Sequence, residues 1–166
     1  MEKNDSNTAQ KLFVQMALAA WDMQNNRFAK LVESLPEGRL LTEIAPGKNT
    51  GVYLLGHLVA VSDHMLPLLG LGERLYPHLE EVFIGNPDTS GLPKPPVSEL
   101  KANLEAVNKR LSEGFAAFSP ENWFERHNAV SETDFEKEPH RNKLNLLLNR
   151  TGHLAYHFGQ MALLKQ

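Results

Sequence analysis

Apolar residues recur every three or four positions along most of the 166-residue chain, and this spacing constrains the fold more than any other feature. No segment shows the strict alternation of apolar and polar residues that is typical of a half-buried strand. The helical pattern covers four stretches, approximately 7–35, 49–70, 98–115 and 142–164. The spacing therefore predicts an all-α protein in which these stretches are the long helices of a four-helix bundle.

Capping residues support the ends of these helices. Asn49 or Thr50 is suited to cap the second helix, Ser98 the third, and Gly70 to end the second. In the first helix the residues expected to face the core are Leu12, Met16, Ala20, Met23, Phe28, Leu31 and Leu35. In the last helix they are Leu144, Leu147, Leu148, Thr151, Leu154, Phe158 and Met161.

A long connection rich in Pro and Gly, residues 73–96, separates the second and third helices and is expected to hold about one helical turn. Its length allows the two middle helices to run in the same direction, which gives an up-down-down-up order. Between the third and last helices, Ser119 and Pro120 predict a short helix. The polar stretch 127–141 is expected to be irregular.

Composition limits the function more than the fold. A chain of this length, with 42% hydrophobic and 22% charged residues, fits a single globular domain over residues 1–166. Seventeen basic against twenty acidic residues, with no basic stripe, argue against a nucleic-acid partner. The N-terminus lacks the pattern of a signal peptide, and no apolar run is expected to cross a bilayer, so we expect a cytoplasmic protein without a membrane partner. The absence of cysteine excludes disulfides, thiolate ligands and a cysteine nucleophile.

The tripeptide GHL occurs twice and places histidines inside segments that are otherwise apolar. His153 and His157 are four residues apart, so a helix places them on one face, with Cβ atoms about 6 Å apart. His57 lies on the apolar face of the second helix, where an unpaired ring would cost about 1–3 kcal/mol. Three imidazoles that meet in the bundle can hold a divalent metal ion and leave one position open. Such an ion can activate water or a thiol. The alternative is that these are hydrogen-bonded structural histidines.

Residues around these histidines are candidates for supporting roles. His64, about 10.5 Å along the helix from His57, is too far to bind the same ion and is a candidate acid or base. Gln160 is a candidate for catalysis or for a hydrogen bond to a ligand. Tyr156 points about 100° away from His157, which favours a packing role. Gly56 and Gly152 either leave room beside a ligand or serve helix packing alone, and Gly159 is expected to serve packing.

The segments GHLVAVSDH (56–64) and HLAYHFGQ (153–160) resemble the DinB-like superfamily, also described as DinB/YfiT-like metalloenzymes. The resemblance implies a four-helix bundle of up-down-down-up order. It also implies that His57, His153 and His157 are ligands of a divalent metal ion, zinc or nickel. Relatives include thiol-dependent S-transferases and an isomerase, which implies a small-molecule substrate, with a low-molecular-weight thiol as one possibility. Homodimers are common among them.

Three functions are consistent with the sequence. The first is a metal-dependent transferase or hydrolase. The second is a non-catalytic metal-binding or stress-response protein. The third is an interaction bundle without metal.

Overall fold

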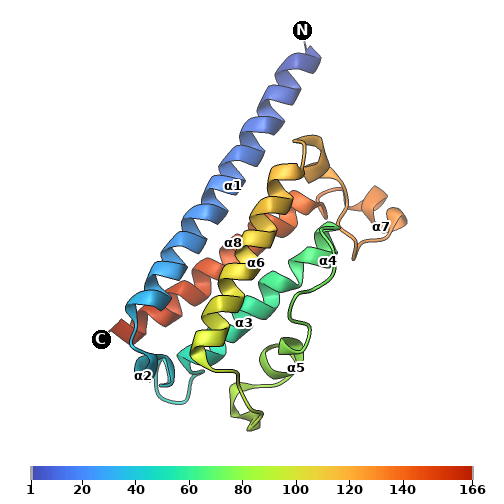
Figure 1. Cartoon of the computed structure of the whole chain (residues 1–166). Coiled ribbons are helices and arrows are strands. Elements are labelled where there is room, and N and C mark those ends of the chain that lie inside the picture. The colour runs from blue at the N-terminus through green and yellow to red at the C-terminus, as the bar shows by residue number, and fades with distance from the viewer. Residues whose placement is uncertain (1, 166) are drawn as a thin grey trace.

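The computed structural model describes residues 2–165, with side chains from residue 7 onward, and all regular secondary structure in this range is helical (Figure 1). The long helices are α1 (Glu2–Ser34), α3 (Gly51–Asp63), α6 (Val97–Ala117) and α8 (Lys143–Met161). The shorter ones are α2 (Glu37–Leu40), α4 (Met65–Leu69), α5 (Leu79–Phe83), η1 (Asp88–Ser90), η2 (Glu121–Phe124), α7 (Glu132–Lys137) and η3 (Ala162–Lys165). The prediction of an all-α protein is confirmed.

The long helices pack side by side. α1 lies along α8, and α3 packs against α6, α8 and the short helix α5. In Figure 1, α1 and α8 run toward the end of the molecule where α2 lies, whereas α3 and α6 begin at that end. The N-terminal part of α1 extends beyond the other helices.

The N-cap predicted at Thr50 is present, and the one predicted at Ser98 is not. The Thr50 side chain accepts a hydrogen bond from the Tyr53 amide, and Asn142 caps α8 in the same way. Ser98 does not cap α6, because the helix already begins at Val97, directly after Pro96. Val97 is 3% exposed, and the first turn that buries it begins two residues earlier than a cap at Ser98 predicts.

The core-facing side of α1 differs from the prediction over its N-terminal half. Leu12, Met16 and Met23 are exposed by 51–60%, and the helix instead buries Val14, Ala17 and Trp21. Both faces are apolar, and the side chain of Trp21, which meets the Phe115 ring edge-on at 6.1 Å, lies on the inward one. On α8, Leu148 is likewise exposed rather than buried.

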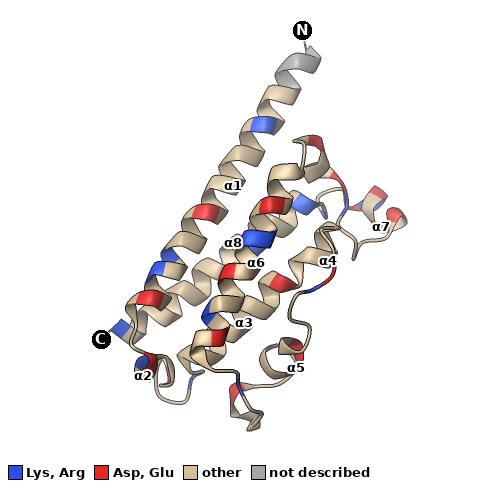
Figure 2. Cartoon of the chain, viewed as in Figure 1, with Lys and Arg blue, Asp and Glu red and all other residues tan. Residues whose placement is uncertain are grey.

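The remaining corrections concern polar segments and hydropathy. Residues 127–141 contain α7, which begins with the Ser131 side chain accepting a hydrogen bond from the Asp134 amide. This helix buries none of its residues, so it carries no apolar periodicity. The stretch Gly51–Leu69 is long and apolar enough to cross a bilayer, contrary to the prediction, but most of it is buried against other helices. Figure 2 shows acidic and basic residues interspersed along the helices.

Candidate metal centre

The imidazoles of His57 from α3 and of His153 and His157 from α8 meet in one cluster. Nε2 of His153 lies 3.3 Å from Nε2 of His57 and 3.0 Å from Nε2 of His157. Each ring offers a nitrogen within 4.8 Å of the nitrogens of the other two. All three side chains are partly buried. Residues 96 positions apart in the sequence therefore share one site.

His57 is oriented by α5. Its Nδ1 lies 2.8 Å from the main-chain oxygen of Phe83. Because a carbonyl oxygen only accepts, Nδ1 carries the proton and Nε2 presents its lone pair to the other histidines. The Tyr53 ring stacks on the His57 ring, with the two planes 9° apart. Both contacts orient the ring plane, and the hydrogen bond to Phe83 fixes the tautomer.

Gly56 is the reason that α5 can approach α3 so closely. A Cβ at this position would lie 2.3 Å from carbons of the Phe83 ring, well inside van der Waals contact. Gly152, in the second GHL, has no atom within 4 Å of the equivalent position, and neither has Gly159. The two GHL segments therefore differ. Gly56 serves packing next to a histidine of the cluster, Gly152 leaves open space, and the packing role predicted for Gly159 is wrong.

Two buried carboxylates hold the 73–96 connection onto α3. Asp63, with no exposed surface, accepts hydrogen bonds from the amides of Leu75 and Tyr76 at 2.8 and 3.0 Å. Asp88 accepts from the amide and hydroxyl of Thr50 at 2.6 and 2.8 Å and forms an ion pair with Lys94 at 2.7 Å. The connection so anchored holds the two short helices α5 and η1 rather than the single turn that was predicted.

The electrostatics of Asp88 agree with this anchoring role. Burial by itself raises the pKa of the Asp88 carboxyl. The hydrogen bonds from Lys94 and Thr50 outweigh burial and leave that pKa below its ordinary value. The charged form of Asp88 is therefore the one that this fold stabilises.

His157 is oriented from its own helix. Its Nδ1 lies 2.7 Å from Oε1 of Gln160, and Nε2 of Gln160 donates to the Tyr156 hydroxyl at 3.1 Å. An amide oxygen only accepts, so His157 also presents the lone pair of Nε2 to the cluster. Gln160 thus contacts a histidine of the cluster rather than the space between the three rings. Tyr156 is 63% exposed, but its ring packs edge-on against the His157 ring with the centroids 5.0 Å apart, and its hydroxyl accepts from Gln160.

The surroundings favour neutral histidines. Burial lowers the pKa of His153 to about 4, helped by the charges of His157, His57 and Arg150. The pKa of His157 is also lowered by burial, which the hydrogen bond to Gln160 opposes only in part. At neutral pH these two rings are uncharged, which is the form of imidazole that binds metal.

These residues fit a divalent metal ion. Zinc binds imidazole nitrogens at about 2.0–2.1 Å, which places the nitrogens of a tetrahedral site about 3.3 Å apart. The observed separations of 3.0 and 3.3 Å agree with that spacing. Acceptors on the outer nitrogens of two rings match the support usually found around metal-bound histidines. Within residues 7–165, no other group of three His, Asp or Glu side chains is arranged closely enough to hold an ion.

His64 lies outside the cluster. It occupies the junction between α3 and α4 and is partly exposed. Sequence reasoning missed the Phe83 carbonyl, since a main-chain acceptor has no sequence signature. It also missed Tyr53, although its position four residues before His57 on one helix face was visible.

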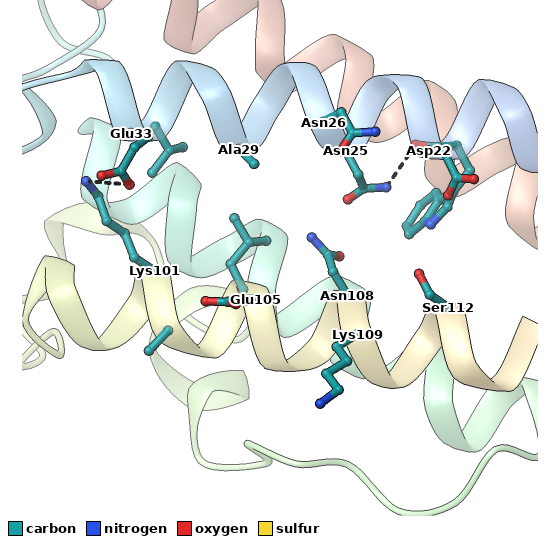
Figure 3. Close-up of a pocket in the computed structure, with 14 residues that line it drawn as sticks. Asp22, Asn25, Asn26, Ala29, Glu33, Lys101, Glu105, Asn108, Lys109 and Ser112 are labelled. Atoms are coloured by element: carbon teal, nitrogen blue, oxygen red, sulfur yellow. Dashed lines mark hydrogen bonds and ion pairs between the residues drawn. The ribbon is translucent and has the colours of Figure 1, made fainter.

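A separate cavity of about 590 Å³ lies between α1 and α6, away from the histidines (Figure 3). Its lining includes Asn25, Asn108 and Ser112 and the ion pair between Lys101 and Glu33 at 3.6 Å. None of the three clustered histidines lines it.

Comparison with known proteins identifies the family. A search of curated proteins gives no match to the chain. The family model of the DinB superfamily matches residues 20–161, which include all three clustered histidines and every long helix except the start of α1. This chain therefore belongs to the DinB superfamily.

Proposed function

We propose that this chain is a divalent-metal-dependent enzyme, a thiol-dependent S-transferase or a metal-assisted hydrolase, with His57, His153 and His157 as the ligands of its metal ion. The observation that carries the proposal is the fixed tautomer of two of the three rings. Nδ1 of His57 and of His157 each donates to an oxygen, so both Nε2 lone pairs face the cluster.

The metal we propose is zinc or nickel, since both accept imidazole ligands. When bound by three histidines, such an ion acts as a Lewis acid toward a thiol or a water molecule. The residues of the chain position that ion. α5 and Tyr53 hold His57, and Gln160 holds His157. The substrate we propose is a small molecule, most simply a low-molecular-weight thiol, and the proposed location is the cytoplasm, where thiols are kept reduced.

The proposed fold is a four-helix bundle formed by α1, α3, α6 and α8 in up-down-down-up order. The shared direction of α1 and α8, opposite to that of α3 and α6, supports this order. Membership of the DinB superfamily supports it as well.

The proposed assembly is a homodimer formed through the outer face of α1. Leu12, Met16 and Met23 form an exposed apolar stripe there. Lys11 and Asp22 lie eleven residues apart, about three helical turns, and flank the same side of the stripe. An antiparallel pair of α1 helices related by a two-fold axis would set Lys11 beside the partner's Asp22, twice over.

Elemental analysis of protein purified without a histidine tag tests the metal site. We expect about one zinc or nickel ion per chain and none after His57, His153 and His157 are all replaced by Ala. Turnover of thiol-conjugating and hydrolysable substrates is then measured on both proteins. Stoichiometric metal without any turnover would favour the non-catalytic alternative, and undiminished turnover by the triple variant would refute the proposed enzyme.

A further inference from the structure

Arg150 lies on α8 one turn before His153, and its charge has no ion-pair partner among the described residues. Three residues separate the two, so they share a helix face, about 4.5 Å apart along the axis. The Nε of Arg150 is buried and has no hydrogen-bond partner among the described residues. Nor does this guanidinium take part in any ion pair of residues 7–165. Arg150 is partly exposed, but a buried guanidinium nitrogen is normally hydrogen-bonded, so this arrangement suits an anion supplied from outside the chain.

His127 is a second side chain near α8 that has a buried nitrogen, Nδ1, without a hydrogen-bond partner among the described residues. The loop that carries it is fastened to α4, because Asn128 donates from its amide to the Leu68 oxygen and from Nδ2 to the Pro67 oxygen, both at 2.8 Å. The same loop is fastened to the start of α8 by the Lys143 amide, which donates to the Glu125 oxygen at 2.9 Å. His127 therefore lies where α4 meets the N-terminal half of α8.

The charges around these two side chains agree with an anion site. Burial lowers the pKa of Arg150. The pKa of His127 is lowered first by burial and then by the charges of Arg141 and Arg150. Since the charge of Arg150 acts on both His127 and His153, it lies in electrostatic range of the metal cluster and of the loop.

Three carboxylates of the neighbouring loop are already engaged elsewhere. They form ion pairs between Glu125 and Lys143, Glu132 and Arg126, and Glu138 and Arg141. None of them is bonded to Arg150 or to His127. Within residues 7–165, no carboxylate therefore forms an ion pair with Arg150.

We propose that Arg150 and His127 form a carboxylate-binding subsite one helical turn from the three histidines. A guanidinium presents a planar fork of donors that matches a carboxylate, and an imidazole N–H can donate to the same group. The second part of the inference rests on the proposed function: the substrate of the metal centre carries a carboxylate about one helical turn from the group that reaches the metal. This narrows the substrate class to small anionic molecules.

The test compares two thiols of similar length on cobalt-loaded protein, 3-mercaptopropionate and 3-mercapto-1-propanol. Thiolate-to-cobalt absorption follows binding. We expect the carboxylate to bind at least ten-fold more tightly than the alcohol. Arg150→Gln should abolish that preference while cobalt content and affinity for the alcohol stay unchanged, and Arg150→Lys should retain part of it. Lys109→Gln, which removes one positive charge from the exposed side of α6, is the matched control and should keep the full preference.

Failure of the subsite and failure of the metal centre give different results. Equal binding of the two thiols by the cobalt-loaded native protein, or an equal loss of preference in Lys109→Gln, would overturn the subsite and leave the metal centre standing. A protein that takes up no cobalt would overturn the proposed function. The subsite is then tested by titrating metal-free protein with propionate, where a shift of the Arg150 Nε–H resonance is expected and its absence would overturn the subsite. If Arg150→Gln does not fold, His127→Gln and Arg150→Lys carry the same comparison.

Discussion

The imidazole of His57 donates a hydrogen bond to the main-chain oxygen of Phe83, 26 residues further along the chain, over a distance of 2.8 Å. This bond joins the core helix α3 to the connection that crosses it. The tautomer of His57 thus depends on the position of α5, which supplies the acceptor oxygen. Anything that displaces α5 should reach the cluster.

Replacing Gly56 by Ala should destabilise the protein and weaken metal binding. The new methyl group would meet the Phe83 ring at 2.3 Å, and overpacking of this kind costs about 1–3 kcal/mol. Denaturant melts and zinc titration measure the two effects. Gly152→Ala is the matched control, because open space surrounds that position, and it should raise stability by about 0.5–1 kcal/mol. Equal effects of the two substitutions would contradict the role of Gly56.

Replacing Gln160 by Leu should lower zinc affinity. The substitution removes the acceptor that orients His157 through Nδ1, and loss of such a partner typically costs 10- to 100-fold in affinity. Gln160→Glu keeps an acceptor oxygen and should bind zinc at least as tightly as the native protein. Competition with a chromogenic chelator measures both, and unchanged affinity in Gln160→Leu would show that the bond is unimportant.

Zinc should raise the melting temperature of the native chain and leave that of His157→Ala unchanged. Binding to the folded state alone stabilises it by about 2.7 kcal/mol when free metal is 100 times the dissociation constant. Scanning calorimetry with zinc and with chelator measures the difference. His64→Ala is the control, since His64 lies outside the cluster and its loss should leave the zinc effect intact.

The metal-free protein should lose stability as the pH falls from 6.5 to about 4. Burial and the neighbouring charges lower the pKa of His153 from 6.5 to about 4, so the unfolded chain binds more protons than the folded chain in that interval. Stability then rises with pH, is complete above 6.5, and shows no further dependence on this residue below about 4. Chemical denaturation in chelator across this range measures the slope. His153→Gln should flatten it, and an equally steep slope in that variant would assign the effect to other groups.

Charge reversal on α1 tests the proposed dimer. Lys11→Glu alone should weaken association, because it would face the partner's Asp22 with like charge. The double variant Lys11→Glu with Asp22→Lys should restore association. Sedimentation velocity measures the dimer fraction. Lys30→Glu is the control, being exposed on the same helix away from this pair. A native protein that stays monomeric at high micromolar concentration would refute the assembly.

Periodicity predicted the helices well because each long helix buries an apolar face. It misjudged the N-terminal half of α1, where two apolar faces compete and tertiary contact with Phe115 from α6 accompanies burial of Trp21. It could not predict α7, which buries nothing. In polar segments such as α7, a helix can be predicted only from its capping residue, here Ser131, because no residue of the helix is buried.

Spacing found the three histidines because four residues is one helical turn and the second GHL matched the first. The supporting contacts were harder to predict. A carbonyl such as that of Phe83 belongs to any residue type, and the buried Asp63 gave no sign that it would bind the amides of Leu75 and Tyr76. The position of Arg150 could have been predicted from helix spacing, as that of His157 was, because Arg150 lies one turn before His153 on the same face.

Because Gly56 and Phe83 approach so closely, the residue that is tolerated at one of these positions depends on the residue at the other. The hydrogen bond to His57 comes from the main-chain oxygen of residue 83, so the side chain there can change without removing that bond, provided that the summed volume at positions 56 and 83 is conserved. A larger residue at position 56 should become tolerable when the aromatic ring opposite is shortened, as in Gly56→Ala with Phe83→Leu. Homologues that lack this glycine are thus expected to carry a smaller side chain on the crossing segment and to keep the same imidazole geometry.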